Sequence, residues 1–345
     1  MRSQRKLWFT LLALVAVHFV VLGAGFFAPY NPNEQHRDDP FAPPMRLHFV
    51  DVEGHFHFRP FAYALEYHPE SLVAVPYAED HSRLLPMRFL VTTKDTTEGM
   101  GQGTSRHLFG VSPPDHLFLL GTDEYGRDQL SRLLYGGQVS LFAGLLATLV
   151  SLGLGMLLGA VSGYCGSWLD QLFMRAAEVF MALPWVYLLF AVRAFLPLHL
   201  GAQQSFFLLV GVIGLTGWAR PSRLVRGVVM SAKHRDYVLA ARSFGASHFY
   251  LVRRHILPET YGVLLTQAAI LIPQYILAEI TLSFLGLGIN EPAPSWGNML
   301  ANLQKLYVLE SYWWMFAAGV AVVPIFLLYY ILADALQHRL QSGQG

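Results

Sequence analysis

Glu279 is the carboxylate of this sequence with the most chemical interest, because it lies inside an apolar stretch, residues 263–289. Ionisable side chains at membrane depth are costly, and they usually face a protein interior or a water-filled cavity. Pro273 precedes it in the same stretch, and its ring and missing N–H are expected to kink a helix there. Glu279 can therefore line a pathway or pair with a neighbouring subunit, although an ordinary hydrogen bond between two helices is a slightly simpler explanation.

No motif of a catalytic centre accompanies Glu279. The sequence has no G-x-x-x-x-G-K-S/T loop to cradle phosphates, no G-x-S-x-G turn to present a serine and no H-E-x-x-H helix to hold zinc. The chain is therefore expected to have no catalytic residue and no cofactor of its own. A process driven by ATP would need both ATP and Mg²⁺ on a partner protein.

Histidines gather in residues 28–137, which hold eight of the fourteen in the chain. His55 and His57 are two positions apart, so a strand would place both on one face. A metal site needs further ligands at a matching spacing, and none accompanies this pair. Cys165 is the only cysteine, which excludes a disulfide or a cysteine-based metal site within the chain. We therefore expect no metal site.

The polar stretch between residues 234 and 258 predicts a helix, a glycine break and a second helix. Gly245 can supply the left-handed turn that ends the first helix, Ser247 can cap the second, and Pro258 would stop it. The first helix has an apolar face at the i, i+3, i+4, i+7 spacing, formed by Tyr237, Ala240, Ala241 and Phe244. Such a hairpin suits docking into a groove of another protein, and a position flat on anionic lipid is the alternative.

Six apolar stretches are long enough to place these residues in a membrane, since a helix needs about 20 residues to cross the hydrocarbon layer. They are residues 7–27, 139–164, 176–198, 205–219, 263–289 and 313–333. With 54% hydrophobic and 14% charged residues, the chain is too apolar for an ordinary soluble domain. The sequence therefore predicts an all-α, multi-pass membrane protein with six transmembrane helices.

The positions of lysine and arginine predict the side on which each loop lies. Arg2, Arg5 and Lys6 precede the first stretch, and eight more cations lie in the loop of residues 220–262. Residues 28–137 instead carry more acids than bases. Both termini and the 220–262 loop are therefore predicted to be cytoplasmic, with the long segment outside.

The long outer segment exceeds a simple connection, and its short runs of Phe, Tyr and Val between Gly and Pro predict strands. These strands are expected at residues 47–52, 55–63, 72–75 and 87–92. We therefore predict three parts. Residues 1–27 form the amino-terminal tail and first helix, residues 28–120 an extracytoplasmic β-rich insertion, and residues 121–345 a core with the other five helices.

The 235–258 stretch resembles the EAA loop of ABC importer permeases. The residues that carry the resemblance are, in order, Ala240, Ala241, Gly245, Leu257 and Pro258. Leu239 stands where the family has a glutamate, and Asp236, one turn earlier, can carry an equivalent charge.

Two further segments resemble the dipeptide, oligopeptide and nickel branch of this family, specifically the second permease of the pair. The first segment precedes the 139–164 stretch and carries Gly121, Thr122, Asp123, Gly126, Arg127 and Asp128. The second follows Glu279 and carries Gly286, Gly288, Pro294, Trp296 and Gly297. The resemblance covers residues 121–336 and the first helix, whereas the outer insertion is longer than the usual family connection.

The resemblance implies a permease subunit of an ATP-driven, binding-protein-dependent importer of di- or oligopeptides in the plasma (inner) membrane of a prokaryote. It implies as partners a second permease, ABC ATPase subunits, an extracytoplasmic substrate-binding protein and the lipid bilayer. The residues that would couple the chain to the ATPase subunits are Asp236, Tyr237, Ala240, Ala241, Phe244, Gly245, Leu257 and Pro258.

Other function classes fit the sequence less well. A secondary transporter driven by ions through Glu279 and His18 is the alternative, but inverted repeats would favour it and none is visible. A membrane-anchored structural protein would leave the helix-glycine-helix loop without a role. A nucleic-acid binder needs a clustered positive excess, which a net charge of +1 does not supply.

Overall fold

The computed structural model describes residues 2–68, 70, 75–95, 103–194 and 201–342. The chain divides into two compact units. Unit 1 comprises Met1–Val15, Leu141–Leu282 and Pro324–Gly345, and unit 2 comprises Ala16–Ser140 and Ser283–Val323. The unit boundaries fall inside the four longest helices of the described chain. The predicted boundaries at residues 27 and 120 stay predictions.

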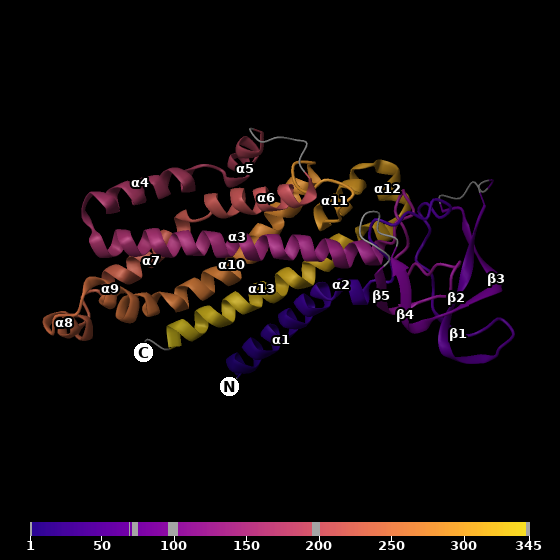
Figure 1. Ribbon diagram of the computed structural model, residues 1–345, viewed down its shortest axis with the longest axis horizontal. Coiled ribbons are helices and arrows are strands. Elements are labelled where there is room, and N and C mark those ends of the chain that lie inside the picture. The colour runs from indigo at the N-terminus through magenta and orange to yellow at the C-terminus, as the bar shows by residue number, and fades with distance from the viewer. Residues whose placement is uncertain (1, 69, 71–74, 96–102, 195–200, 343–345) are drawn as a thin grey trace. The chain divides into compact units, whose positions relative to one another are not determined.

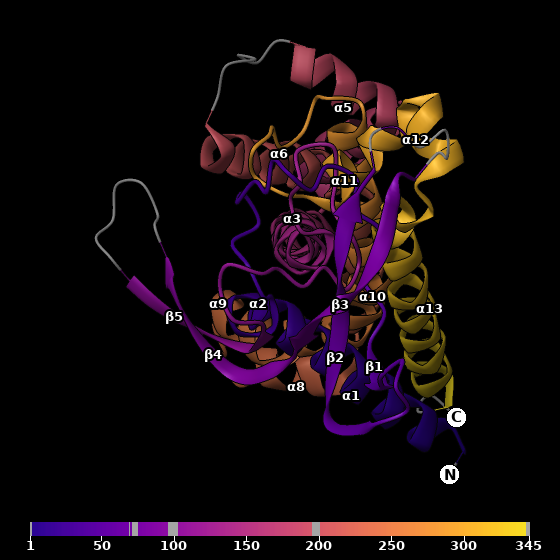
Figure 2. The ribbon, with the colours of Figure 1, turned by 90° about the vertical axis from the view of Figure 1, so that its right-hand side faces the viewer.

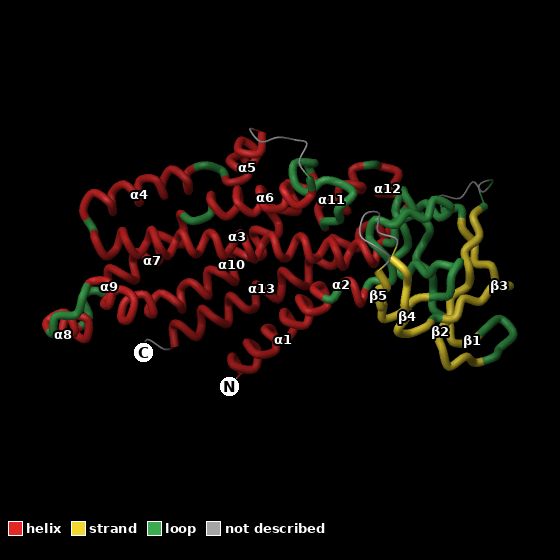
Figure 3. The backbone as a smooth tube through the Cα atoms, in the orientation of Figure 1, coloured by secondary structure: helices red, strands yellow, loops and turns green. Residues whose placement is uncertain are grey.

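Helices make up most of the described residues, as the red segments of Figure 3 show. The α-helices are α1 (Arg2–Leu22), α2 (Ala24–Phe27), α3 (Gln129–Cys165), α4 (Ser167–Ala182), α5 (Trp185–Ala194), α6 (Ala202–Thr216), α7 (Ala219–Ala232), α8 (Asp236–Ser243), α9 (His248–Leu251), α10 (Leu257–Phe284), α11 (Trp296–Ala301), α12 (Leu306–Ser311) and α13 (Ala317–Ser342). A π-helical turn, Val252–Ile256, joins α9 to α10.

Four helical stretches in the described ranges are long and apolar enough to cross a membrane. They are Arg5–Leu22, Gln129–Cys165, His248–Phe284 and Trp313–Arg339. The pair α6 and α7 adds a fifth crossing if it acts as one broken span, and its halves meet at 44°. These stretches overlap every predicted span except the third. A multi-pass helical membrane protein is therefore confirmed, whereas the count of six spans is not.

The predicted third span, residues 176–198, falls on two shorter helices. α4 ends at Ala182 and α5 begins at Trp185, so that Pro184 lies between them. A residue before proline is pushed out of the helical region, and Leu183 is extended, with φ −76° and ψ 132°. Residues 195–198 lie outside the described chain. The proline explains why apolar composition did not produce one continuous helix here.

Small residues bring α3 and α7 together in unit 1. A Cβ atom at Gly159 would lie 2.4 Å from the carbonyl oxygen of Ser222, and one at Gly163 would lie 2.8 Å from that of Arg226. Close approach of two helix backbones through small residues is common in membranes. The contact fixes the start of the polar loop, which follows α7, against the end of α3.

The strands that the structure describes all belong to unit 2. β1 (His48–Val50), β2 (Phe56–Tyr67) and β3 (Tyr77–Pro86) form an antiparallel sheet in this order. β4 (Arg88–Asp95) and β5 (Gly103–Gly110) form a separate antiparallel pair, visible beside the first sheet in Figure 2. A buried cluster lies between these strands and the flanking loops, formed by Ala42, Met45, Ala62, Ala64, Leu85, Met87, Val111, Leu117 and Phe118.

The strands differ in part from the expected ones. β1, β2 and β4 lie on the runs expected at residues 47–52, 55–63 and 87–92, although β2 continues to Tyr67. The run at 72–75 falls almost entirely outside the described residues. Neither β3 nor β5 was expected. In β3 the strand is hidden by its polar run from Glu79 to Arg83. Its backbone pairing with β2, and not its own hydrophobic pattern, makes it a strand.

Candidate functional site

The α8–α9 hairpin has the geometry expected of a helix, a glycine turn and a second helix. The N–H of Gly245 donates to the carbonyl of Arg242 at 3.0 Å, and the N–H of Ala246 donates to that of Ala241 at 3.2 Å. Gly245 has φ +83°, so this is a Schellman turn with glycine in the left-handed position. The Ser247 hydroxyl accepts from the N–H of Tyr250 and caps α9. The predictions for Gly245 and Ser247 are confirmed.

The prediction that Pro258 stops the second helix is wrong. α9 runs through the π-helical turn directly into α10, and Pro258 is the second residue of α10. The turn before it is π-helical, with the N–H of Leu257 donating to the carbonyl of Val252 five residues earlier, so Pro258 follows a point where the regular i→i−4 pattern is already interrupted. Leu257 and Pro258 therefore join the hairpin to α10 as one helical rod.

One side of α8 packs inside the chain and the other is open. Val238 is 3% exposed and lies in a cluster with Val229, Leu251 and Ile256, so α8 is held against α7 and α9. Phe244 is 93% exposed, and Tyr237 is 42% exposed. Ala240 is also exposed, whereas Ala241 is half-buried against the cluster. The predicted apolar face therefore remains largely uncovered by the described chain.

Polar contacts fix the hairpin to its neighbours. Glu259 in the first turn of α10 accepts hydrogen bonds from Arg235 at 3.0 Å and from the Tyr237 hydroxyl at 2.8 Å. Partial burial and this carboxylate raise the pKa of Tyr237. Asp236 is exposed in the first turn of α8, where an acidic side chain complements the helix dipole. Leu239, at the family's glutamate position, is 43% exposed.

A second set of contacts holds the base of the hairpin. The Asp170 carboxylate of α4 accepts from Arg226 of α7 at 2.5 and 2.6 Å, a bidentate pair, and also from the Ser162 hydroxyl. Tyr164, at the end of α3, lies 2.6 Å from Nδ1 of His248. Figure 1 shows α8 and α9 at the end of unit 1 where α7 stops and α10 begins. The exposed face of α8 therefore belongs to a hairpin whose second helix, α9, and neighbouring helices, α3, α4 and α7, are linked by hydrogen bonds.

Two glycines in the segment before α3, Gly121 and Gly126, occupy positions where a side chain would clash with neighbouring backbone. Gly121 and Gly126 have φ of +70° and +71°. A Cβ atom at Gly121 would lie 2.6 Å from the carbonyl oxygen of Ala42, and one at Gly126 would lie 1.8 Å from that of His36. Both are therefore needed for conformation and for close packing. Thr122 pairs with Asp128 in an isolated bridge, which closes the turn.

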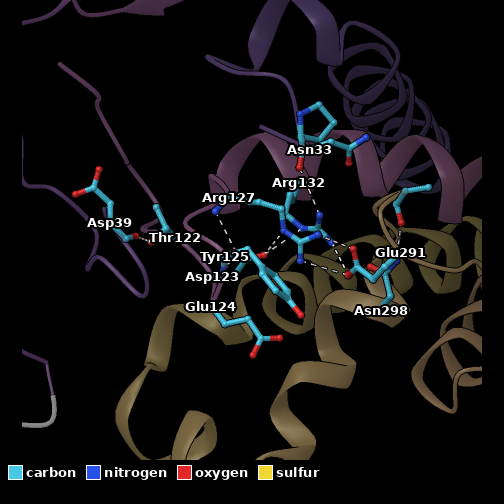
Figure 4. Close-up of polar contacts among 12 residues, drawn as sticks. Asn33, Asp39, Thr122, Asp123, Glu124, Tyr125, Arg127, Arg132, Glu291 and Asn298 are labelled. Atoms are coloured by element: carbon cyan, nitrogen blue, oxygen red, sulfur yellow. Dashed lines mark hydrogen bonds and ion pairs between the residues drawn. The ribbon is translucent and has the colours of Figure 1, made fainter. Parts of the chain in front are cut away.

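Buried charges inside this turn reach the segment after α10. Asp123 is fully buried, and its Oδ2 accepts from Nε of Arg127 at 2.7 Å. Arg127 also donates to Glu291 at 2.6 Å, and Arg132 donates to the same carboxylate at 2.9 Å. Figure 4 shows the two guanidinium groups between Asp123 and Glu291. The two motif segments that the sequence singled out thus meet in unit 2.

The segment after α10 is packed by its motif residues. Gly286 has φ +73°, and a Cβ atom at Gly288 would lie 2.1 Å from the Ser283 hydroxyl oxygen. Trp296 is 2% exposed and donates from Nε1 to the carbonyl of Leu133 in α3 at 2.9 Å. Pro294 and Gly297, on either side of it, are also buried. These residues fix α11 against α3, which is a structural role.

The described residues show no metal-binding arrangement, since no group of three or more His, Cys, Asp or Glu side chains converges. His57 bonds instead to Asp51, with Nε2 2.9 Å from Oδ2. Hydrogen bonds from His57 and from the N–H of His55 lower the pKa of Asp51 to about 2. This cluster is a turn contact between β1 and β2.

A family model described as "Binding-protein-dependent transport system inner membrane component" matches residues 155–342, more than half of the chain. This stretch includes the α8–α9 hairpin. The chain belongs to this family. It is a permease subunit of a binding-protein-dependent importer and an integral membrane protein.

Relatives of this permease place it in the expected branch. The dipeptide transport system permease protein DppC of Bacillus subtilis (strain 168) is 37% identical over 231 residues, which are 66% of this chain and 69% of that protein. The oligopeptide transport system permease protein OppC of the same organism is 34% identical over 246 residues, 69% and 77% of the two chains. A solved chain of the inward-facing MetNI methionine ABC transporter has a TM-score of 0.46 at 18% identity, over 59% of this chain and 93% of that one. The predicted resemblance to the peptide branch is therefore confirmed.

Glu279 of the permease is fully buried in α10. Pro273 lies inside α10, which continues through it. Tyr275, one turn before Glu279, bonds to the Ser151 hydroxyl of α3 at 2.9 Å. A cavity of about 450 Å³ in unit 1 is lined by Tyr275 and not by Glu279. The lining of this cavity does not test Glu279, and both its role in a pathway and its pairing with a second subunit stay predictions.

Several residues that build these sites gave no sequence signal. Glu291 is one acid in a loop, and only folding brings it to Arg127. Arg132 lies four residues after Asp128, the last residue of the first motif, but its position next to Glu291 depends on packing. Glu259 and Asp170 are single carboxylates in helices. One hint for Glu259 was present in the sequence, namely its position just before the apolar stretch of residues 263–289.

Proposed function

We propose that this permease carries di- or oligopeptides into the cytoplasm of a prokaryote across its plasma membrane. A second permease completes the pathway, ABC ATPase subunits bind ATP and Mg²⁺, and an extracytoplasmic binding protein delivers the peptide. The observation that carries the proposal is the exposed face of α8, with Phe244 93% uncovered on a firmly anchored hairpin. The family match supports its use as a coupling surface.

Peptides are the proposed substrate because of the relatives' names. DppC and OppC of Bacillus subtilis are permeases of a dipeptide and an oligopeptide transport system, at 37% and 34% identity. The family match favours a binding-protein-dependent importer over the ion-coupled alternative that would use Glu279.

The hairpin transmits movement through its connection to α10. When the ATPase subunits close on ATP, they displace the α8 face that they cover. Arg235 and Tyr237 are bonded to Glu259, and α9 continues into α10 through Leu257 and Pro258. A displacement of α8 therefore moves the start of α10 with it. Rigid transmission of this kind needs the buried contact of Val238 that holds α8 in place.

The strands of unit 2 offer a surface for the binding protein. Phe58 is 93% exposed and Phe56 62% exposed on β2, and their rings meet edge to face. Exposed aromatic side chains are typical anchors of protein interfaces. Changing both to Ser should raise the concentration of binding protein needed for half-maximal ATPase stimulation. Phe89→Ser on β4 is the control, because Phe89 is 60% exposed, nearly the same as Phe56.

Uptake by the complete importer tests the proposed substrate. The permease, its partner permease, the ATPase subunits and the binding protein are reconstituted in proteoliposomes with ATP. Labelled dipeptide, labelled tetrapeptide and a nickel chelate are supplied in parallel. ATP-dependent accumulation of a peptide supports the proposal, whereas accumulation of nickel alone contradicts it.

A further inference from the structure

A cavity in unit 1 combines an apolar wall with one cation. Its volume is about 450 Å³, within the range of small-ligand pockets. Five helices (α4, α5, α6, α7 and α10) and the Gly217 break contribute to its lining, and most of the side chains are apolar, such as Phe180, Leu271 and Leu277. The polar side chains that line it include Arg220, Gln274 and Tyr275.

The cavity lies deep between the helices. Tyr275 is bonded to Ser151, which is fourteen residues before the end of α3. At 1.5 Å per residue, the cavity lies about 20 Å from that helix end. The α6–α7 pair can act as one broken membrane span, and Arg220 lies in the first turn after the break between its halves. Arg220 lines the cavity at the break between α6 and α7, and the cytoplasmic side expected for residues 220–262 stays a prediction.

Arg220 is available to a ligand. It makes no ion pair or hydrogen bond with any residue of the described chain, and it is exposed to the cavity. A guanidinium group at the break of a membrane span is costly without an anion. Its planar fork matches a carboxylate through two parallel hydrogen bonds. The apolar residues of the lining suit uncharged side chains.

Resting on the proposed function, we infer that Arg220 receives the C-terminal carboxylate of a peptide in transit. Gln274 offers both a donor and an acceptor amide group to the peptide backbone, and the apolar wall accepts its side chains. The site therefore binds the C-terminal carboxylate and the backbone, which all linear peptides share, and does not discriminate between their side chains. A transport pathway needs this property if one permease is to serve many sequences.

The test compares two forms of one dipeptide, the free acid and the C-terminal amide. Uptake of each is measured in proteoliposomes holding the complete importer with the wild-type permease, Arg220→Gln or Arg220→Lys. The uptake by each variant is divided by the wild-type uptake of the same peptide, so that any preference of the binding protein cancels. Arg223→Gln, an exposed arginine on the same helix outside the cavity lining, is the matched control.

Arg220→Gln should lower uptake of the free acid about tenfold, because one charge-assisted interaction is lost, and should change uptake of the amide less than twofold. Arg220→Lys should retain part of the free-acid uptake, and Arg223→Gln all of it. Equal losses for acid and amide would overturn the inference while leaving the peptide importer intact. A loss of uptake in the Arg220 variants that changes with the anionic lipid content of the proteoliposomes would also overturn the inference. Arg220 would then be assigned to a lipid phosphate. No uptake of either form by wild type would overturn the proposed substrate itself.

Discussion

Arg127 donates a hydrogen bond from Nη1 to Oε2 of Glu291 at 2.6 Å, across 164 positions of the sequence. The bond joins the turn before α3 to the segment after α10, both within unit 2. Arg127 is 4% exposed and also bonded to the fully buried Asp123, whereas the Glu291 side chain is 44% exposed. The two carboxylates therefore contribute very differently to stability.

Loss of Arg127 should cost more than loss of the charge on Glu291. Arg127→Met leaves the Asp123 carboxylate buried without its main partner, a change of about 3 kcal/mol. Glu291→Gln removes a half-exposed charge and keeps an amide oxygen that can accept from Arg127 and Arg132, a change of about 1 to 2 kcal/mol. Thermal unfolding of the purified importer should show a clearly larger fall in melting temperature for Arg127→Met.

The control for this pair is Lys305→Gln, which breaks an exposed ion pair with Glu124. It should leave the melting temperature almost unchanged, because exposed pairs contribute little. Equal shifts for Arg127→Met and Lys305→Gln would contradict the assignment of Arg127 to a buried network.

Asp128 predicts a pH dependence of stability. Burial raises the pKa of this carboxyl to about 6, although Ser131 donates two hydrogen bonds to its Oδ2. The unfolded carboxyl titrates near 4, so the folded state holds the proton more tightly between about pH 4 and 6. The contribution of Asp128 to stability is therefore greatest below pH 4, falls as pH rises to 6, and is constant above.

Asp128→Asn should remove this slope, because an amide oxygen still accepts from Ser131 and carries no charge. At pH 7 the variant should be more stable than wild type by up to about 3 kcal/mol. Melting temperatures measured from pH 4.5 to 7.5 provide the check. Asp38→Asn, in an exposed loop of the same unit, should keep the wild-type slope. A wild-type slope in Asp128→Asn would exclude Asp128 as its source.

The sequence predicted what depends on local chemistry. Gly245 and Ser247 act within one turn of their own positions, so spacing alone located the hairpin. Proline was harder to interpret, because its effect depends on the backbone conformation around it, such as the π-helical turn before Pro258. Pro258 begins α10, whereas Pro184 separates α4 from α5. The same residue type thus gave one wrong expectation and one missed break.

The sequence could not predict contacts that only the tertiary fold creates. Glu291 and Arg127 are far apart in the chain, and no local pattern links them. The strand β3 is polar and owes its conformation to pairing with β2. Arg220 looked like one of many loop cations, because the sequence does not show the cavity that it lines.

The predicted orientation can be tested with single cysteines. Cys165 is exposed and must first be changed to Ala. Glu53→Cys lies in the turn between β1 and β2, and Ser231→Cys lies at the end of α7. In sealed right-side-out vesicles, an impermeant thiol reagent should label Glu53→Cys and leave Ser231→Cys unlabelled until the membrane is opened. Labelling of Ser231→Cys in intact vesicles would reverse the proposed topology.

The turn at Gly245 offers the most direct test of coupling. A Cβ atom there would meet nothing within 4 Å, so Gly245→Val acts through its backbone alone. A β-branched residue in the left-handed region costs about 1 to 2 kcal/mol and reorients α8 relative to α9. Gly227 on α7 also has open space around it, so Gly227→Val is the matched control with ordinary helical geometry.

The deciding measurement is the number of peptides taken up per ATP hydrolysed by the complete importer in proteoliposomes. The Gly245→Val importer should keep its assembly with the ATPase subunits and hydrolyse ATP, while peptide uptake per ATP falls severalfold. Gly227→Val should keep the wild-type ratio. A wild-type ratio in the Gly245→Val importer would contradict the claim that the α8–α9 hairpin couples hydrolysis to transport.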